Sequence, residues 1–175
     1  MTQYSKRMVI IHWLTLVLLV VAWFLGSSLA DATDESKATL AGYVAHLSAG
    51  GAILLLTMVR FYFRRKDGIP APVGDTPMDK LAKGVHHLLY ALLFLLPVSG
   101  ITIILTSKVG AALLAGDANL LPKEHDYGHV FAHSVHELLV TVLIVLVVLH
   151  LLGAIKHQFV LKDGLLNRMS LRKRI

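Results

Sequence analysis

The chain has 175 residues, of which 55% are hydrophobic and only 16% are charged, well below the roughly 25% charged residues of a typical soluble domain. This balance, together with a mean hydropathy of +0.67, excludes a disordered chain, a two-domain soluble enzyme and a nucleic-acid-binding module. The absence of cysteine excludes disulfide bonds, iron–sulfur clusters and thioether-linked haem.

Four long apolar runs follow one another along the chain, at about residues 8–30, 40–63, 82–106 and 134–158. Each is close to the about 20 residues that cross a hydrocarbon layer of about 30 Å. A cleaved signal peptide is an alternative for the first run, but that run is too long and has no obvious small-residue cleavage site. Since a backbone in lipid must satisfy its own hydrogen bonds, the runs are predicted to be helices. We therefore expect an all-α protein: one integral membrane four-helix bundle over residues 1–175.

The basic residues predict the topology. Fourteen of the seventeen lysines and arginines lie on the side that holds the N-terminus, the joint between the second and third runs, and the C-terminal tail. Only Lys37, Lys108 and Lys123 lie on the other side. The positive-inside rule then predicts that both termini are cytoplasmic. The basic tail is interpreted as a feature of topology and of contact with lipid headgroups.

Four of the ten histidines lie within or at the ends of the runs, at depths that match in pairs. His46 and His136 lie near the predicted outer ends of their runs and form the outer pair. His12 and His150 lie near the predicted inner ends and form the inner pair. His136 and His150 are fourteen residues apart, nearly four helical turns, so they lie on the same helix face about 21 Å apart.

Buried imidazoles are costly in lipid unless a function uses them. Haem iron takes axial nitrogen ligands from histidine, so the two pairs predict two stacked haems with two histidines each. Such irons have no vacant position, and they would move electrons rather than bind oxygen. One alternative is that each histidine bonds a carbonyl of a neighbouring helix. Another is a metal-binding or transport protein that uses His125, His129, His133 and His136, although no intramembrane carboxylate continues a cation path.

Two further residues are candidates for contacts at the inner site. His86, at the start of the third run, could face a haem propionate or a quinone headgroup; the alternative is an interfacial histidine. Arg60 could pair with a carboxylate of the inner haem; the alternative is a topology signal. The Gly50–Gly51 pair, one turn beyond His46, could admit a flat macrocycle or could serve helix packing.

The combined pattern resembles the bacterial cytochrome b-561 family over about residues 5–172. The resemblance rests on IHWLTLVLLV around His12, on GYVAHLSAGGAILLLTMVR around His46, on HHLLYALLFLLPVSG in the third run, and on VHELLVTVLIVLVVLHLLGAIKHQF around His136 and His150. It implies a four-helix inner-membrane bundle with two b haems, the inner one ligated by His12 and His150 and the outer one by His46 and His136.

The resemblance also implies an activity, superoxide oxidation coupled to ubiquinone reduction, with the membrane quinone as electron acceptor. The outer joints hold six acidic residues against three lysines, whereas steering of an anion calls for positive potential at the entrance. A non-catalytic electron carrier for a soluble periplasmic partner is therefore the alternative function.

Overall fold

The computed structural model describes residues 3–30, 39–71, 74–121 and 131–172. Within these residues the secondary structure is helical, without strands, and the all-α prediction is confirmed. Four helices are long and apolar enough to cross a membrane. They are α1 (Lys6–Ala30), α2 (Leu40–Asp67), α3 (Pro77–Thr106) and α6 (Phe131–Ile155), and α6 continues through a π-helical turn, η2 (Lys156–Leu161).

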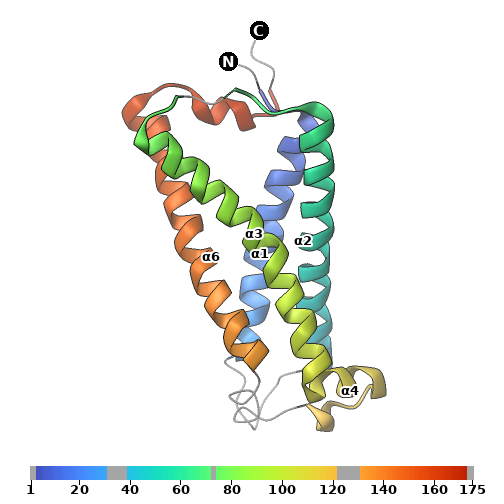
Figure 1. Ribbon diagram of the computed structural model, residues 1–175. Helices are drawn as coiled ribbons and strands as arrows, with labels where there is room; N and C mark the ends of the chain where they lie inside the picture. The colour runs from blue at the N-terminus through green and yellow to red at the C-terminus, as the bar shows by residue number, and fades with distance from the viewer. Residues whose placement is uncertain (1–2, 31–38, 72–73, 122–130, 173–175) are drawn as a thin grey trace.

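The long helices pack as two antiparallel pairs. α1 lies along α2, α3 lies along α6, and the two pairs meet where α2 contacts α3. Both termini lie at one end of the bundle, which we call the terminal end, as Figure 1 shows. Neither α1 nor α2 packs along α6, although side chains from these helices approach one another at two depths.

The interior is small for a protein of this size. One cluster of four buried leucines lies between α3 and α6: Leu92, Leu96, Leu143 and Leu146. Even in the best-buried spans only 22% of the apolar window is buried, and in α6 only 6%. Most of the apolar surface therefore faces outward, which is stable only in a hydrocarbon solvent.

Polar caps begin the helices at the joints. The Thr39 side chain accepts the backbone N–H of Gly42 at the start of α2. α3 begins with a capping box, in which Thr76 and Asp79 satisfy each other's backbone N–H groups and Pro77 occupies the first turn. Both devices satisfy backbone donors that a helix leaves unpaired at its N-terminus. α3 therefore starts in polar sequence ahead of its apolar run, whereas α2 starts at the first residue of its run, directly after its polar cap.

A short helix lies at the end of the bundle opposite the termini. α4 (Lys108–Ala115) follows α3 after Ser107, which caps it, and it ends at Gly116 in the left-handed region (φ 66°). Val109 and Ala112 are buried beneath it, whereas Leu114 is 93% exposed. A 3-10 turn, η1 (Ala118–Leu120), follows. This end of the bundle thus carries a small amphipathic element that the sequence did not predict.

The C-terminal segment folds back onto the terminal end. The carbonyl of Arg168 accepts the backbone N–H of Tyr4 at 3.1 Å, and the carbonyl of Met169 accepts the indole N–H of Trp13 at 3.1 Å. The Arg168 guanidinium donates to the carbonyl of Ala71 at 2.7 Å. The tail, including η3 (Leu165–Met169), is therefore tied to both α1 and the joint after α2.

Candidate functional site

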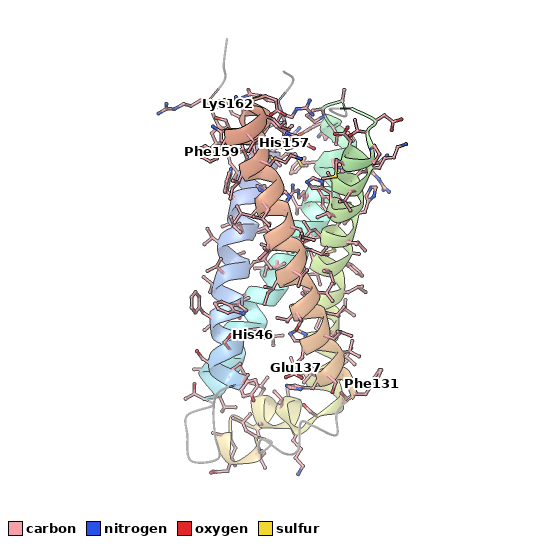
Figure 2. The ribbon with its side chains drawn as sticks, turned by 90° about the vertical axis from the view of Figure 1, so that its left-hand side faces the viewer. His46, Phe131, Glu137, His157, Phe159 and Lys162 are labelled. Atoms are coloured by element: carbon pink, nitrogen blue, oxygen red, sulfur yellow. The ribbon has the colours of Figure 1, made fainter. Side chains whose placement is uncertain are left out.

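The outer pair of histidines comes together across the bundle. His46 on α2 and His136 on α6 have ring centroids 6.3 Å apart, with an interplanar angle of 73°. Figure 2 shows His46 toward the α4 end of the bundle, far from His157 at the terminal end. Both rings are partly buried. The helices that carry them do not pack along each other, so the two rings face each other across an interhelical space.

The neighbours of the outer pair fix the proton on one nitrogen of each ring. His46 Nδ1 lies 3.0 Å from the carbonyl oxygen of Ala22, which can only accept. The Ser99 hydroxyl donates to the carbonyl of Leu96 at 2.8 Å, so it accepts from His136 Nδ1 at 2.8 Å. Both imidazoles therefore carry the proton on Nδ1 and keep the Nε2 lone pair, the arrangement that metal-ligating histidines use.

One glycine makes room for an outer ring, and the sequence analysis missed it. A Cβ at Gly26 would lie 3.0 Å from Cε1 of His46, closer than side chains normally approach. A Cβ at Gly100 would lie 3.7 Å from Cε1 of His136, an ordinary van der Waals contact, so the His136 ring does not require a glycine there. The Gly50–Gly51 pair behaves differently, since a Cβ at either residue would meet nothing within 4 Å. Gly50 and Gly51 are therefore not required for close helix packing.

The inner pair repeats the outer geometry at the terminal end. His12 on α1 and His150 on α6 have ring centroids 6.3 Å apart, with an interplanar angle of 72°. A third imidazole, His86 on α3, lies 5.1 Å from His150. Its Nδ1 donates to the carbonyl of Ala82 at 2.7 Å, which leaves its Nε2 lone pair free. The inner cluster thus brings together three histidines from three helices.

Arg60 enters this inner cluster. Its Nη1 lies 3.2 Å from His12 Nδ1, and its guanidinium carbon lies 5.2 Å from the ring centre of Tyr90. Its Nε is buried and has no hydrogen-bond partner among the described residues. A guanidinium only donates, so His12 Nδ1 accepts here and its proton lies on Nε2. For His12 to bind a metal through Nε2, this proton must move and Arg60 must release the ring.

Both pairs have the spacing that a metal between two imidazoles requires. Each metal–nitrogen bond is about 2 Å and each ring centre lies about 1 Å behind its nitrogen, so the ring centres should be about 6 Å apart. The observed 6.3 Å in each pair meets this requirement. Arg60 also brings a positive charge to the inner pair, and its buried Nε has no hydrogen-bond partner among the described residues. An anionic group bound there would accept from this Nε and balance the charge. The residues therefore fit two haems with two histidines each.

The other histidines lie in different surroundings. Nδ1 of His133 lies 3.7 Å from Oε2 of Glu137, one turn further along α6. His157 donates from Nδ1 to Asp163 at 2.5 Å, and this hydrogen bond lowers the pKa of Asp163 below its ordinary value. His125 and His129 lie outside the described residues. Within the part of the chain that is described, no three histidine, aspartate or glutamate side chains gather as a metal site.

Comparison with known proteins points to one family. The sequence model described as "Prokaryotic cytochrome b561" matches residues 3–170. A protein of Cereibacter sphaeroides named "Cytochrome b562" is 31% identical over 176 residues, covering 97% of this chain and 98% of its own. A Yersinia pestis protein named "Probable superoxide oxidase CybB" is 31% identical over 178 residues, covering 98% of each. "Cytochrome b561 homolog 1" of Escherichia coli is 23% identical over 176 residues.

Proposed function

The chain belongs to the prokaryotic cytochrome b561 family, and from this premise we propose that it transfers electrons through two b-type haems. Membership makes it a multi-pass protein of the bacterial inner membrane that carries electrons, with haem b as cofactor. In our proposal His12 and His150 hold the inner haem, and His46 and His136 hold the outer haem.

The observation that carries this proposal is the matched geometry of the two pairs. The inner histidine pair joins α6 to α1 and the outer histidine pair joins α6 to α2, with the same 6.3 Å between ring centroids. Haem supplies a one-electron iron couple, and two imidazole ligands leave that iron no vacant position. The fourteen residues between His136 and His150 separate the pairs by about 21 Å along α6. The sites are therefore spaced to carry charge between the two membrane faces.

The surrounding residues have separate tasks. Ser99 and the carbonyl of Ala22 hold the outer imidazoles in the ligating tautomer. Arg60 is placed to leave His12 and pair with a propionate of the inner haem, which would satisfy its buried Nε. His86, with a free Nε2 beside His150, is placed to contact a propionate or a quinone headgroup. These residues bind and orient, and the redox chemistry belongs to the cofactor.

The terminal end is proposed to face the cytoplasm. Twelve of the thirteen lysines and arginines in the described segments belong to this end of the bundle, and positive charge marks the cytoplasmic side of membrane proteins. The inner pair then lies toward the cytoplasm, and the outer pair toward the periplasm.

The proposed reaction is oxidation of superoxide with reduction of ubiquinone. Two superoxide anions would each lose an electron and leave as dioxygen. One ubiquinone would gain these two electrons and two protons from water to become ubiquinol. The name of the Yersinia relative supports this choice of donor. The quinone is the acceptor that the family resemblance implies, and a membrane-embedded protein has direct access to it.

A second candidate is a carrier that takes electrons from a soluble periplasmic protein. The joints on the side opposite the termini contain six acidic residues and three lysines. A net negative charge in these joints would suit a basic protein partner better than a small anion. Both candidates use the same histidines and differ only in the donor.

Stopped-flow spectroscopy separates the candidates. The purified protein is mixed first with superoxide and then with a ubiquinone analogue, while the absorbance of the haems is followed. The superoxide oxidase proposal predicts reduction faster than spontaneous dismutation, followed by reoxidation by the quinone. A rate no faster than dismutation, in protein that dithionite still reduces fully, would reject superoxide as donor and favour the carrier.

A further inference from the structure

A groove between α2 and α3 opens at the terminal end, outside the histidine cluster. It has a volume of about 730 Å³ and its lining includes Phe61, Arg64 and Arg65 from α2, and His87, Tyr90 and Phe94 from α3. The residues of each helix follow a spacing of three and four, so each set lies on one helix face. The groove is therefore built by two facing stripes.

The groove changes character along its length. Arg64, Arg65 and His87 lie toward the terminal end, where α2 finishes and α3 begins, whereas Phe94 lies more than one turn deeper along α3. Its apolar lining is open to the surroundings, since Phe61 is 42% exposed and Phe94 is 46% exposed. A ligand held here would meet cations at the membrane surface and apolar side chains below it.

The two arginines lack protein anions. Within the described segments neither Arg64 nor Arg65 forms an ion pair, while Asp67, the nearest carboxylate in sequence, is taken by Arg7 and Ser5. Arg64 lies over the ring of Tyr90, with 5.6 Å from its guanidinium carbon to the ring centre. Tyr90 also contacts the ring of Phe61, with centroids 5.0 Å apart. The floor of the groove thus supports the Arg64 guanidinium.

We propose that this groove binds the headgroup of an anionic phospholipid, with its phosphodiester between Arg64 and Arg65 and an acyl chain along Phe61 and Phe94. Guanidinium groups bind phosphate oxygens with paired hydrogen bonds and keep their charge at an interface. Basic pockets between membrane helices are suited to such headgroups. A neutral quinone would leave both cations without a counter-charge, so the lipid is the better occupant.

Native mass spectrometry of the full-length protein tests this proposal. Delipidated protein in detergent is titrated with dioleoylphosphatidylglycerol, with dioleoylphosphatidylcholine and with inorganic phosphate. We expect phosphatidylglycerol to bind roughly tenfold more tightly than phosphatidylcholine, and inorganic phosphate not to compete at equal concentration because it lacks the acyl chain. Saturable competition by phosphate would identify a free-anion site and overturn the lipid assignment.

Matched variants locate the site. The double variant Arg64→Gln/Arg65→Gln should reduce the preference for phosphatidylglycerol to that for phosphatidylcholine. The control Lys66→Gln/Lys83→Gln removes two cations from the same end but outside the groove lining, and should keep the preference. If both double variants lost the preference for phosphatidylglycerol equally, the lipid would be held by unspecific charge attraction, and the proposal would be overturned. Tight binding of decylubiquinone that is lost only in the arginine variant would assign the groove to the quinone instead.

A second substitution keeps the test decisive if the arginine variant does not fold, as judged by far-UV circular dichroism and gel filtration. Phe94→Trp enlarges a side chain in the apolar part of the groove without changing charge. It should weaken binding of phosphatidylglycerol while leaving the helical content unchanged. Unaltered lipid binding in a folded Phe94→Trp protein would show that the acyl chain lies elsewhere, contrary to the proposal.

Discussion

At the scale of single residues, the site depends on which nitrogen of each imidazole holds the proton. At the outer pair the Ala22 carbonyl and the Ser99 hydroxyl keep that proton on Nδ1. At the inner pair Arg60 donates to Nδ1 of His12, so the proton of that imidazole lies on Nε2 instead. The outer pair is therefore prepared for a metal at Nε2, whereas the inner pair needs Arg60 to move. We expect the outer haem to bind more readily than the inner one during assembly.

His150→Ala should remove the inner haem and leave the outer haem bound, because the outer pair has its own ligands and hydrogen bonds. The measurement is the reduced-minus-oxidised visible spectrum, with haem counted per chain. The matched control is His157→Ala, seven residues further along the same helical segment, which should retain both haems. His86 lies 5.1 Å from His150. Retention of both haems in His150→Ala, with loss of one in His86→Ala, would contradict the assigned pairing.

Gly26→Ala should disturb the outer haem alone, because the new Cβ would lie 3.0 Å from the His46 ring. We expect haem affinity at the outer site to fall by about tenfold to a hundredfold, as when the support of a metal ligand is altered. Gly84→Ala, whose Cβ would meet nothing within 4 Å, is the control. It should be neutral or slightly stabilising, since alanine favours helix. Equal haem content of the two variants over a haem titration would refute the role of Gly26.

At the scale of elements, the four long helices could be predicted because each is an apolar run longer than the bilayer core. The depth pairing of the histidines follows from the same runs, and the ring distances agree with it. α4 could not be predicted, since eight residues are too few to establish a periodic signal beside an apolar span. The helix ends were also underestimated, because α2 and α3 extend into polar sequence through caps and basic turns.

The support of the site could not be predicted for a different reason. Gly26 is twenty residues from His46, and Ser99 is thirty-seven from His136. These relations arise from helix packing and leave no mark in local spacing. The sequence analysis instead singled out Gly50 and Gly51, which adjoin His46 along α2 but face open space. The pairing of the four histidines was therefore predictable from depth, whereas the residues that orient their rings were not.

The C-terminal segment provides a pH-dependent element. His157 donates to Asp163, and this hydrogen bond lowers the pKa of Asp163 from its ordinary 3.8. A carboxylate whose pKa is lower in the folded protein than in the unfolded chain stabilises the fold. This stabilisation is complete when the pH is above the pKa of the unfolded chain, and it is lost as the pH falls through the pKa of the folded protein. The tail should therefore stay docked from pH 7 down to about pH 4, and loosen at lower pH.

Limited proteolysis at a series of pH values, with an acid-active protease, measures this loosening. Asp163→Asn should make the C-terminal segment easier to cleave at pH 5. The further increase in cleavage that the unaltered protein shows below pH 5 should then be mostly absent. Asp75→Asn, at an exposed ion pair with Lys80, is the control and should behave like the unaltered protein. A tail cleaved equally in the unaltered protein and in Asp163→Asn at every pH would exclude the role of this contact.

At the scale of the whole molecule, the two ends differ in charge. Both termini lie at one end of the bundle (Figure 1), and twelve of the thirteen lysines and arginines in the described segments belong to that end. A green fluorescent protein fused to the C-terminus should therefore fluoresce, because it folds in the cytoplasm, and a fused alkaline phosphatase should be inactive. The reverse result would place the termini in the periplasm and exchange the sides of the inner and outer pairs.

The whole account depends on two haems being held by four histidines from three helices. The most direct test is the ratio of haem b to protein in the purified chain, determined by the pyridine haemochrome method and quantitative amino-acid analysis. The account predicts two haems per chain, both with the low-spin spectrum of two imidazole ligands. A single haem per chain, or a colourless protein that contains zinc in place of iron, would contradict it.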